Sequence, residues 1–195
     1  MKIIARDALA LLDHLGIREA VVGGVSMGGY AAMALLREDA GRVKGLVLID
    51  THPAADDEDG KARREESARA VLERGPEVLI DAMLPKLLAP SASDALRNEV
   101  QEIIFANSAA GCAAAQRGMA RRPDSREVLS RYAGPALVVV GEQDALVPPA
   151  KAKAMAELMS GAALVELPGA GHLSNLETPS EFNRALESFL AQIRW

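Results

Sequence analysis

The sequence EAVVGGVSMGGYAAMALL, residues 19–36, decides how this chain is expected to fold. Its first five residues form an apolar run that predicts a short buried strand, and residues 30–36 predict a helix of small side chains that packs closely on a sheet. The turn between them places Ser26 in a G-x-S-x-G pattern. A serine on such a turn is exposed at the carboxyl edge of the sheet. Gly24 and Gly28 on either side are expected to let the neighbouring backbone pass without a Cβ clash.

Three further apolar runs extend the strand pattern: residues 42–50 (RVKGLVLID), 134–141 (GPALVVVG) and 163–167 (ALVEL). The first of these is continuous rather than alternating, which is typical of a parallel strand covered on both faces. Strand, helix and strand at this spacing predict a right-handed crossover. We therefore predict an α/β protein with a mostly parallel sheet of about four strands flanked by helices in three layers.

Helical patterns flank these strands. Apolar residues at helical spacing predict a first helix that Gly16 ends, and residues 149–159 predict another that begins with proline and is ended by Gly161. Residues 178–181 (TPSE) have the pattern of a capping box and predict the start of the last helix. The apolar stripe of that helix consists of Phe182, Leu186, Phe189, Leu190 and Ile193.

Residues 53–132 have a different character, because they begin with a charged loop and contain no strand-like run. Candidate helices cover roughly 61–74, 77–88, 94–107, 110–120 and 125–131. An all-helical segment between two parallel strands predicts a lid over the carboxyl edge of the sheet. The core would then consist of residues 1–52 and 133–195. The alternative is that these helices pack elsewhere on the sheet.

Composition excludes several classes of function. A chain of 195 residues makes one domain, or one with a modest insertion. A net charge of -5 and a pI near 5.3 argue against nucleic acid as a partner and against a basic membrane-binding face. The only cysteine, Cys112, excludes an internal disulfide framework and is expected in the core. Charged residues interrupt the first apolar segment, so we expect no signal peptide and a cytoplasmic protein.

Two further polar residues follow predicted strands. Asp144 lies in the sequence GEQD after residues 134–141, and His172 ends the sequence PGAGH after residues 163–167. Because the carboxyl ends of parallel strands meet at one edge, both side chains are expected beside Ser26. A nucleophile, an acid and a base in the order Ser, Asp, His are expected for an α/β-hydrolase triad.

Other residues give weaker hypotheses. Asp50, which follows the second strand, is an alternative acid, although the residues around Asp144 fit better. His52 is interpreted as the start of the lid rather than as a pocket residue. The same strand-turn-helix layout occurs in dinucleotide sites, but Ser26 occupies the position where close approach of a pyrophosphate requires glycine. The three histidines lack metal-ligand spacing, so neither a metal nor a cofactor is expected.

The motifs G-x-S-M-G-G, G-x-x-D-x-x-x-P and G-x-G-H resemble those of the α/β-hydrolase superfamily, and in particular its lidded esterases and enol-lactonases, over essentially the whole chain. The resemblance implies Ser26 as nucleophile, His172 as general base, Asp144 as its orienting acid and the Met27 N–H as one oxyanion-hole donor. Members usually have many more residues before the serine than the 25 here, including an H-G loop with the second donor. Nothing before Ser26 resembles that loop, so we expect a reduced α/β-hydrolase.

The expected function is that of a serine carboxylesterase acting on small, largely apolar esters through an acyl-enzyme. The same triad would serve a lactonase, a carbon–carbon hydrolase or a perhydrolase. A non-catalytic, hydrolase-like binding protein is the alternative from another class, and a dinucleotide-binding protein is a third. Because residues 19–23 are expected to form an open apolar edge, we also expect a homodimer that covers it.

Overall fold

A computed structural model describes residues 1–194 and contains one parallel sheet. Its strands lie in the order β1 (Ala20–Val25), β2 (Val43–Ile49), β3 (Ala136–Gly141) and β4 (Ala163–Leu167). Each strand pairs with its neighbour in the sequence, and every crossover contains helix. The predicted α/β fold with four parallel strands is therefore confirmed.

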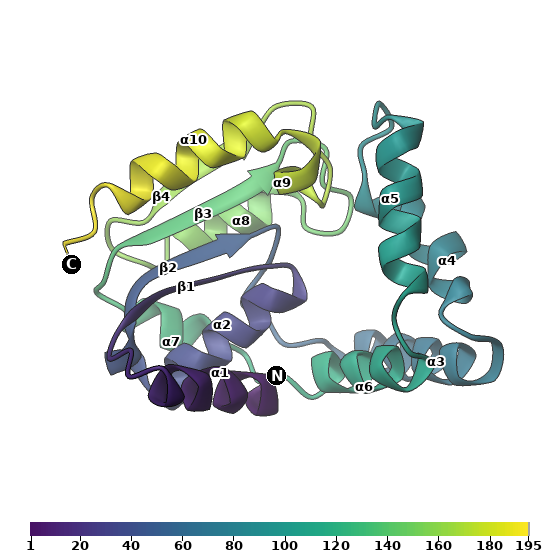
Figure 1. Cartoon of the computed structure of the whole chain (residues 1–195), viewed down its shortest axis with the longest axis horizontal. Helices are drawn as coiled ribbons and strands as arrows, with labels where there is room; N and C mark the ends of the chain where they lie inside the picture. The colour runs from purple at the N-terminus through teal and green to yellow at the C-terminus, as the bar shows by residue number, and fades with distance from the viewer. Residues whose placement is uncertain (195) are drawn as a thin grey trace.

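Helices cover both faces of this sheet (Figure 1). One face is covered by α1 (Lys2–His14), α2 (Met27–Glu38), α7 (Arg126–Ser130) and α8 (Pro149–Ala156), with a short 3-10 turn at Ala40–Arg42 after α2. The other face is covered by α10 (Pro179–Leu190), which follows the short α9 (Ser174–Glu177). All residues of β3 are buried, and most of those of β2 are, as expected for strands between two helical layers.

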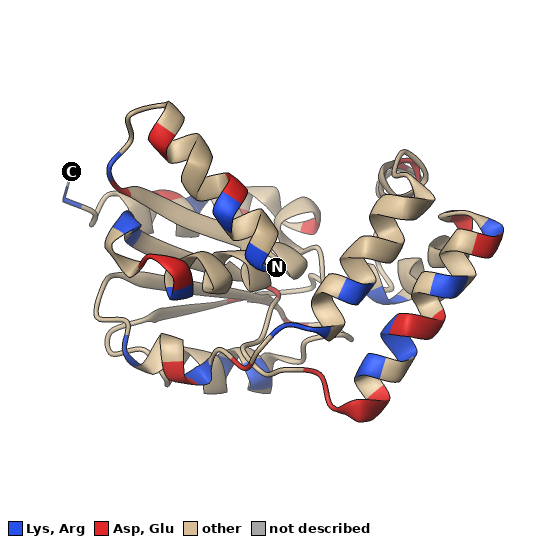
Figure 2. Cartoon of the chain, turned by 90° about the horizontal axis from the view of Figure 1, so that it is seen from below, with Lys and Arg blue, Asp and Glu red and all other residues tan. Residues whose placement is uncertain are grey.

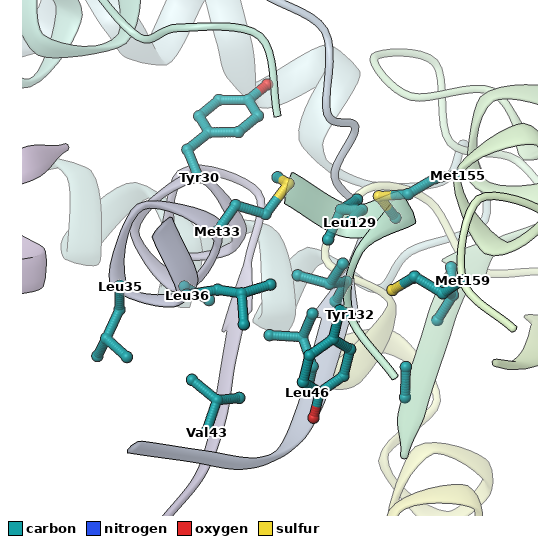
Figure 3. Packing of buried hydrophobic residues seen from close by; sticks show 14 of the residues in the cluster. Tyr30, Met33, Leu35, Leu36, Val43, Leu46, Leu129, Tyr132, Met155 and Met159 are labelled. Carbon is teal, nitrogen blue, oxygen red and sulfur yellow. The ribbon is translucent and has the colours of Figure 1, made fainter. Parts of the chain in front are cut away.

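The larger core cluster lies between β2, β3 and the first helical layer. Figure 3 shows Met33 of α2, Leu46 of β2 and Leu129 of α7 among its side chains. Leu46 and Leu129 are completely buried. Burying one such side chain stabilises the folded state by roughly 1.5–3 kcal/mol. Leucine, methionine and valine thus build most of the core in a chain that is poor in aromatic residues.

Four helices lie beyond the carboxyl ends of the strands (Figure 1), and we refer to them as the cap helices. They are α3 (Glu58–Arg74), α4 (Glu77–Leu87), α5 (Asp94–Phe105) and α6 (Ala109–Ala120). α3 packs along α6. By contrast, α7 contacts α2 and places Leu129 in the sheet-bearing core. The expected lid, residues 53–132, includes α7, which packs with the core rather than with the cap helices. The boundaries of the lid stay a prediction.

Some local expectations differ from the structure. β1 continues to Val25 and α2 begins at Met27, so only Ser26 separates them. The capping box before α10 does not form, because the hydroxyl of Thr178 donates to the carbonyl of Ser174 and caps no N–H of α10. That bond ends α9 instead, one residue before α10 begins at Pro179.

Candidate active site

Ser26 occupies the sharp turn between β1 and α2. Its backbone angles are φ 51° and ψ -109°, a conformation that non-glycine residues rarely adopt and that costs on the order of 1–3 kcal/mol. Two hydrogen bonds hold it there: the Ser26 N–H donates to the carbonyl of Ile49 at 2.8 Å, and the Thr51 hydroxyl donates to the carbonyl of Ser26 at 2.9 Å. β2 therefore fixes the position of the serine.

The glycines around Ser26 have unequal roles. A Cβ on Gly24 would lie 2.2 Å from the carbonyl carbon of Gly28, and one on Gly29 would lie 2.5 Å from the Thr51 methyl group. A Cβ on Gly28 would meet no atom within 4 Å. The expectation that Gly28 relieves a clash was therefore wrong, because the close approaches fall on Gly24 and Gly29.

The three predicted side chains form one chain of hydrogen bonds. Ser26 Oγ lies 2.8 Å from His172 Nε2, and His172 Nδ1 lies 2.8 Å from Asp144 Oδ2 and 3.0 Å from Oδ1. His172 and Asp144 are 2% and 4% exposed. In the tautomer that donates its Nδ1–H to the carboxylate, Nε2 is the atom that accepts from the serine hydroxyl.

Backbone groups fix Asp144 in this position. Its Oδ1 accepts from the N–H groups of Leu146 and Val147, both at 2.8 Å. These bonds set the plane of the carboxylate toward the imidazole. Of the two candidate acids, the structure thus brings Asp144 to His172.

Asp50 has a different set of partners. Its Oδ1 accepts from the N–H of Gly141 at 2.9 Å, and its Oδ2 accepts from the hydroxyl of Ser174 at 2.6 Å and from its N–H at 3.2 Å. The side chain is completely buried, and burial raises the pKa of Asp50 to about 6. Asp50 thus ties the end of β2 to the end of β3 and to the segment that follows His172.

The loop that carries His172 is also tied to the cap helices. Glu177 accepts from the N–H of Gly171 at 2.7 Å and from the N–H of Ala89 at 2.8 Å. The Leu173 N–H donates to the carbonyl of Leu87, the last residue of α4, at 2.9 Å. These bonds fix the end of α4 beside the histidine.

A cavity of about 370 Å³ opens in front of Ser26 and His172. One part of its wall is apolar and combines core and cap residues. Those side chains are Met27, Met83, Leu87, Met119, Leu146 and Val147.

His52 lines this cavity, contrary to our expectation that it only begins the lid. Its Nε2 lies 3.1 Å from the hydroxyl of Tyr30, which also faces the cavity. Burial, together with the nearby charges of Arg122 and Lys151, lowers the pKa of His52 to about 4, so the ring is neutral at physiological pH.

Another part of the cavity wall is polar. Arg64 of α3 donates to Asp56 Oδ2 at 3.2 Å and to Gln116 Oε1 at 3.1 Å. Arg122 donates to Asp56 Oδ1 at 2.7 Å, and its guanidinium lies 4.1 Å from the centre of the Tyr30 ring. Burial alone would raise the pKa of Asp56, but Arg122 and Arg64 hold it below its ordinary value. Our expectation of small, largely apolar esters as substrates did not include such a group of charged side chains at the cavity.

The remaining expectations concern Met27, Cys112 and bound metal. Met27 is the first residue of α2, so its N–H has no acceptor within that helix and is positioned beside Ser26. Cys112 on α6 is only partly buried, so it is not a core residue as expected. Within residues 1–194, no three His, Cys, Asp or Glu side chains gather as a metal site requires, and no helix is long and apolar enough to cross a membrane.

Comparison with known proteins shows the family and agrees with the fold. Residues 3–185 match the Alpha/beta hydrolase family. The malate-bound structure of a thermophilic esterase from Thermogutta terrifontis is 35% identical to this chain with a TM-score of 0.95, over 98% of this chain and 72% of that one. The 3-oxoadipate enol-lactonase 2 of Acinetobacter baylyi is 29% identical over 96% of this chain and 69% of its own length. The pimeloyl-[acyl-carrier protein] methyl ester esterase of Chromobacterium violaceum is 31% identical, over 94% and 75% respectively.

Proposed function

Because this chain belongs to the alpha/beta hydrolase family, we propose that it is a serine hydrolase that cleaves small carboxylic esters. The observation that carries the proposal is the unbroken series of hydrogen bonds from Ser26 through His172 to Asp144. A buried carboxylate, an imidazole and a hydroxyl in this order can remove a proton from the hydroxyl as it attacks.

In the proposed reaction, the hydroxyl oxygen of Ser26 attacks the ester carbonyl while His172 Nε2 accepts its proton. Asp144 stabilises the imidazolium that forms. The tetrahedral oxyanion accepts a hydrogen bond from the Met27 N–H, at the positive end of the α2 dipole. His172 then gives its proton to the leaving alcohol, and water hydrolyses the acyl-enzyme by the same steps in reverse order.

The cavity and the relatives together indicate the size and type of substrate. A volume of about 370 Å³ suits short acyl and alcohol groups, and its apolar wall provides contacts for them. The names of the relatives include esterases and an enol-lactonase. A lactone is an internal ester, so lactone hydrolysis by the same triad is the second candidate reaction.

The test is hydrolysis of p-nitrophenyl acetate and butyrate by the wild-type protein and by Ser26→Ala. We expect the substitution to lower kcat by at least about 10³-fold. Ser130→Ala, which changes an exposed serine on α7, is the matched control and should retain activity. Equal activity in wild type and Ser26→Ala would refute the mechanism. A wild-type protein without activity on esters or lactones would favour the non-catalytic alternative.

A cytoplasmic homodimer is the last part of this proposal. β1 is an edge strand, because β2 is its only partner in the described sheet. Edge strands expose backbone groups that pair readily with another chain, and a twofold pairing is the commonest way to cover them. Light scattering after size exclusion tests it: a clean, active monomer near 20.6 kDa would show that the proposal is wrong.

A further inference from the structure

Two basic side chains of the cap helices line the cavity of Ser26 and His172, and both belong to α3: Arg63 and Arg64. The side chain of Arg64 is 25% exposed, whereas the side chain of the adjacent Arg63 is 71% exposed. Figure 2 shows blue and red bands along α3, and most of these charged residues are exposed. Arg64 is distinguished from Arg63 by its lower exposure and by its hydrogen bonds to Asp56 and Gln116.

The protein holds Arg64 in a fixed orientation. Asp56 accepts from its Nε, and Gln116, which is 9% exposed on α6, accepts from its Nη1. Among the hydrogen bonds of residues 1–194, none uses its Nη2. A guanidinium presents five N–H donors in a rigid fork, so donors remain for a ligand without rearrangement of the side chain.

The charges at this wall do not balance. Among residues 1–194, Asp56 is the only acidic side chain that lines the cavity, and it is shared between Arg64 and the buried Arg122. His52 on the same side is neutral and adds no charge. One carboxylate thus faces two guanidinium groups in a partly desolvated place, so binding of an additional anion is favoured there. A carboxylate forms the strongest pair with a guanidinium, because it accepts two parallel N–H bonds.

We propose that Arg64 binds a carboxylate of the substrate, so that the preferred substrates are short esters carrying a free acid group remote from the scissile bond. The inference rests on the proposed esterase function and specifies its substrate class. The apolar wall would contact the methylene groups between the two ends, and Ser26 would attack the ester end. Gln116 and Asp56 are positioning residues that hold the guanidinium.

The experiment compares monoethyl esters of succinic, glutaric and adipic acid with ethyl butyrate, valerate and hexanoate, in which a methyl group replaces the carboxylate. We expect wild type to prefer at least one half-ester by tenfold or more in kcat/KM. Arg64→Gln should lower kcat/KM for that half-ester about 10- to 100-fold, mainly through KM. It should change the value for the matched neutral ester less than about threefold. Arg64→Lys keeps the charge but lacks the guanidinium fork, so its kcat/KM for the half-ester should lie between the values for wild type and Arg64→Gln.

Arg69→Gln is the matched control, because Arg69 lies on the same helix, is 70% exposed and pairs with Glu65 outside the cavity. It should keep the half-ester preference. An equal loss on both ester series in Arg64→Gln and Arg64→Lys would show a purely structural role and overturn the inference. Ser26-dependent hydrolysis without any half-ester preference would overturn the inference alone. Absence of all ester hydrolysis would overturn the proposed function as well.

Discussion

The buried carboxyl of Asp50 is expected to impose a measurable pH dependence on stability. Its pKa is about 6 in the folded protein and near 3.9 in an unfolded chain. Between these values the folded state binds more protons than the unfolded state, so Asp50 contributes stability below about pH 4 that is lost as pH rises through about 6. At roughly 1.4 kcal/mol per pKa unit, the contribution is on the order of 3 kcal/mol.

Asp50→Asn removes this titration, while its amide oxygen can still accept from the Gly141 N–H. The margin by which wild type exceeds the variant in stability should therefore fall by up to about 3 kcal/mol between pH 4 and pH 7. Urea unfolding of both proteins at four pH values across this range measures the margin. Asp81→Asn, at an exposed position of α4, makes the same change of charge and should show a constant margin. A margin for Asp50→Asn that is constant, or that grows with pH, would refute the reasoning.

Three further predictions follow from packing and hydrogen bonding. Gly24→Ala should prevent folding or lower the free energy of unfolding by at least about 3 kcal/mol. Gly28→Ala, whose Cβ would meet no atom outside its own helix, should lower it by about 1 kcal/mol or less in thermal unfolding, and equal losses in the two variants would contradict the contact geometry. Leu129→Ala should cost about 2–5 kcal/mol in urea unfolding because the side chain is fully buried, and a loss below about 1 kcal/mol would place α7 outside the core. Asp144→Asn should lower kcat about 10³- to 10⁴-fold with an unchanged circular dichroism spectrum, because an amide does not hold the imidazole of His172 in the required tautomer; near-wild-type kcat would contradict that role.

The sheet could be predicted because its strands carry their own signal. The runs at residues 45–49 and 136–141 are continuously apolar, which is typical of a parallel strand that is covered on both faces. Ser26, Asp144 and His172 could be predicted for a related reason. Each follows a strand, and parallel strands bring their carboxyl ends to one edge. Sequence position therefore determines spatial position for these residues.

The polar wall of the cavity could not be predicted in this way. Arg64 lies on α3, where charged residues occur around most of the helix, so no apolar stripe indicates which side faces inward. Its orientation depends on Asp56 and on Gln116, which is 52 positions away in the sequence. Periodicity within one helix contains no information about such a partner.

The backbone geometry around the site also could not be predicted from the amino-acid sequence. Gly28 and Gly29 are adjacent in the first turn of α2, yet only Gly29 approaches Thr51. Asp50 has the positive φ of 47° and the buried partners that make it a link between strands, and neither is visible in the run that it follows. Whether a carboxylate at the end of a strand is a catalytic acid or a structural link can be decided only when the positions of its partners, here Gly141 and Ser174, are known.

Covalent labelling with a fluorophosphonate tests the central claim most directly, because the reagent requires an activated serine rather than a particular substrate. Intact mass and peptide mapping of the folded wild-type protein should show a single adduct on Ser26, and the folded Ser26→Ala variant should show none. Folded wild-type protein that stays unlabelled, or an adduct that is retained in Ser26→Ala, would contradict the claim that Ser26, His172 and Asp144 form a working nucleophile.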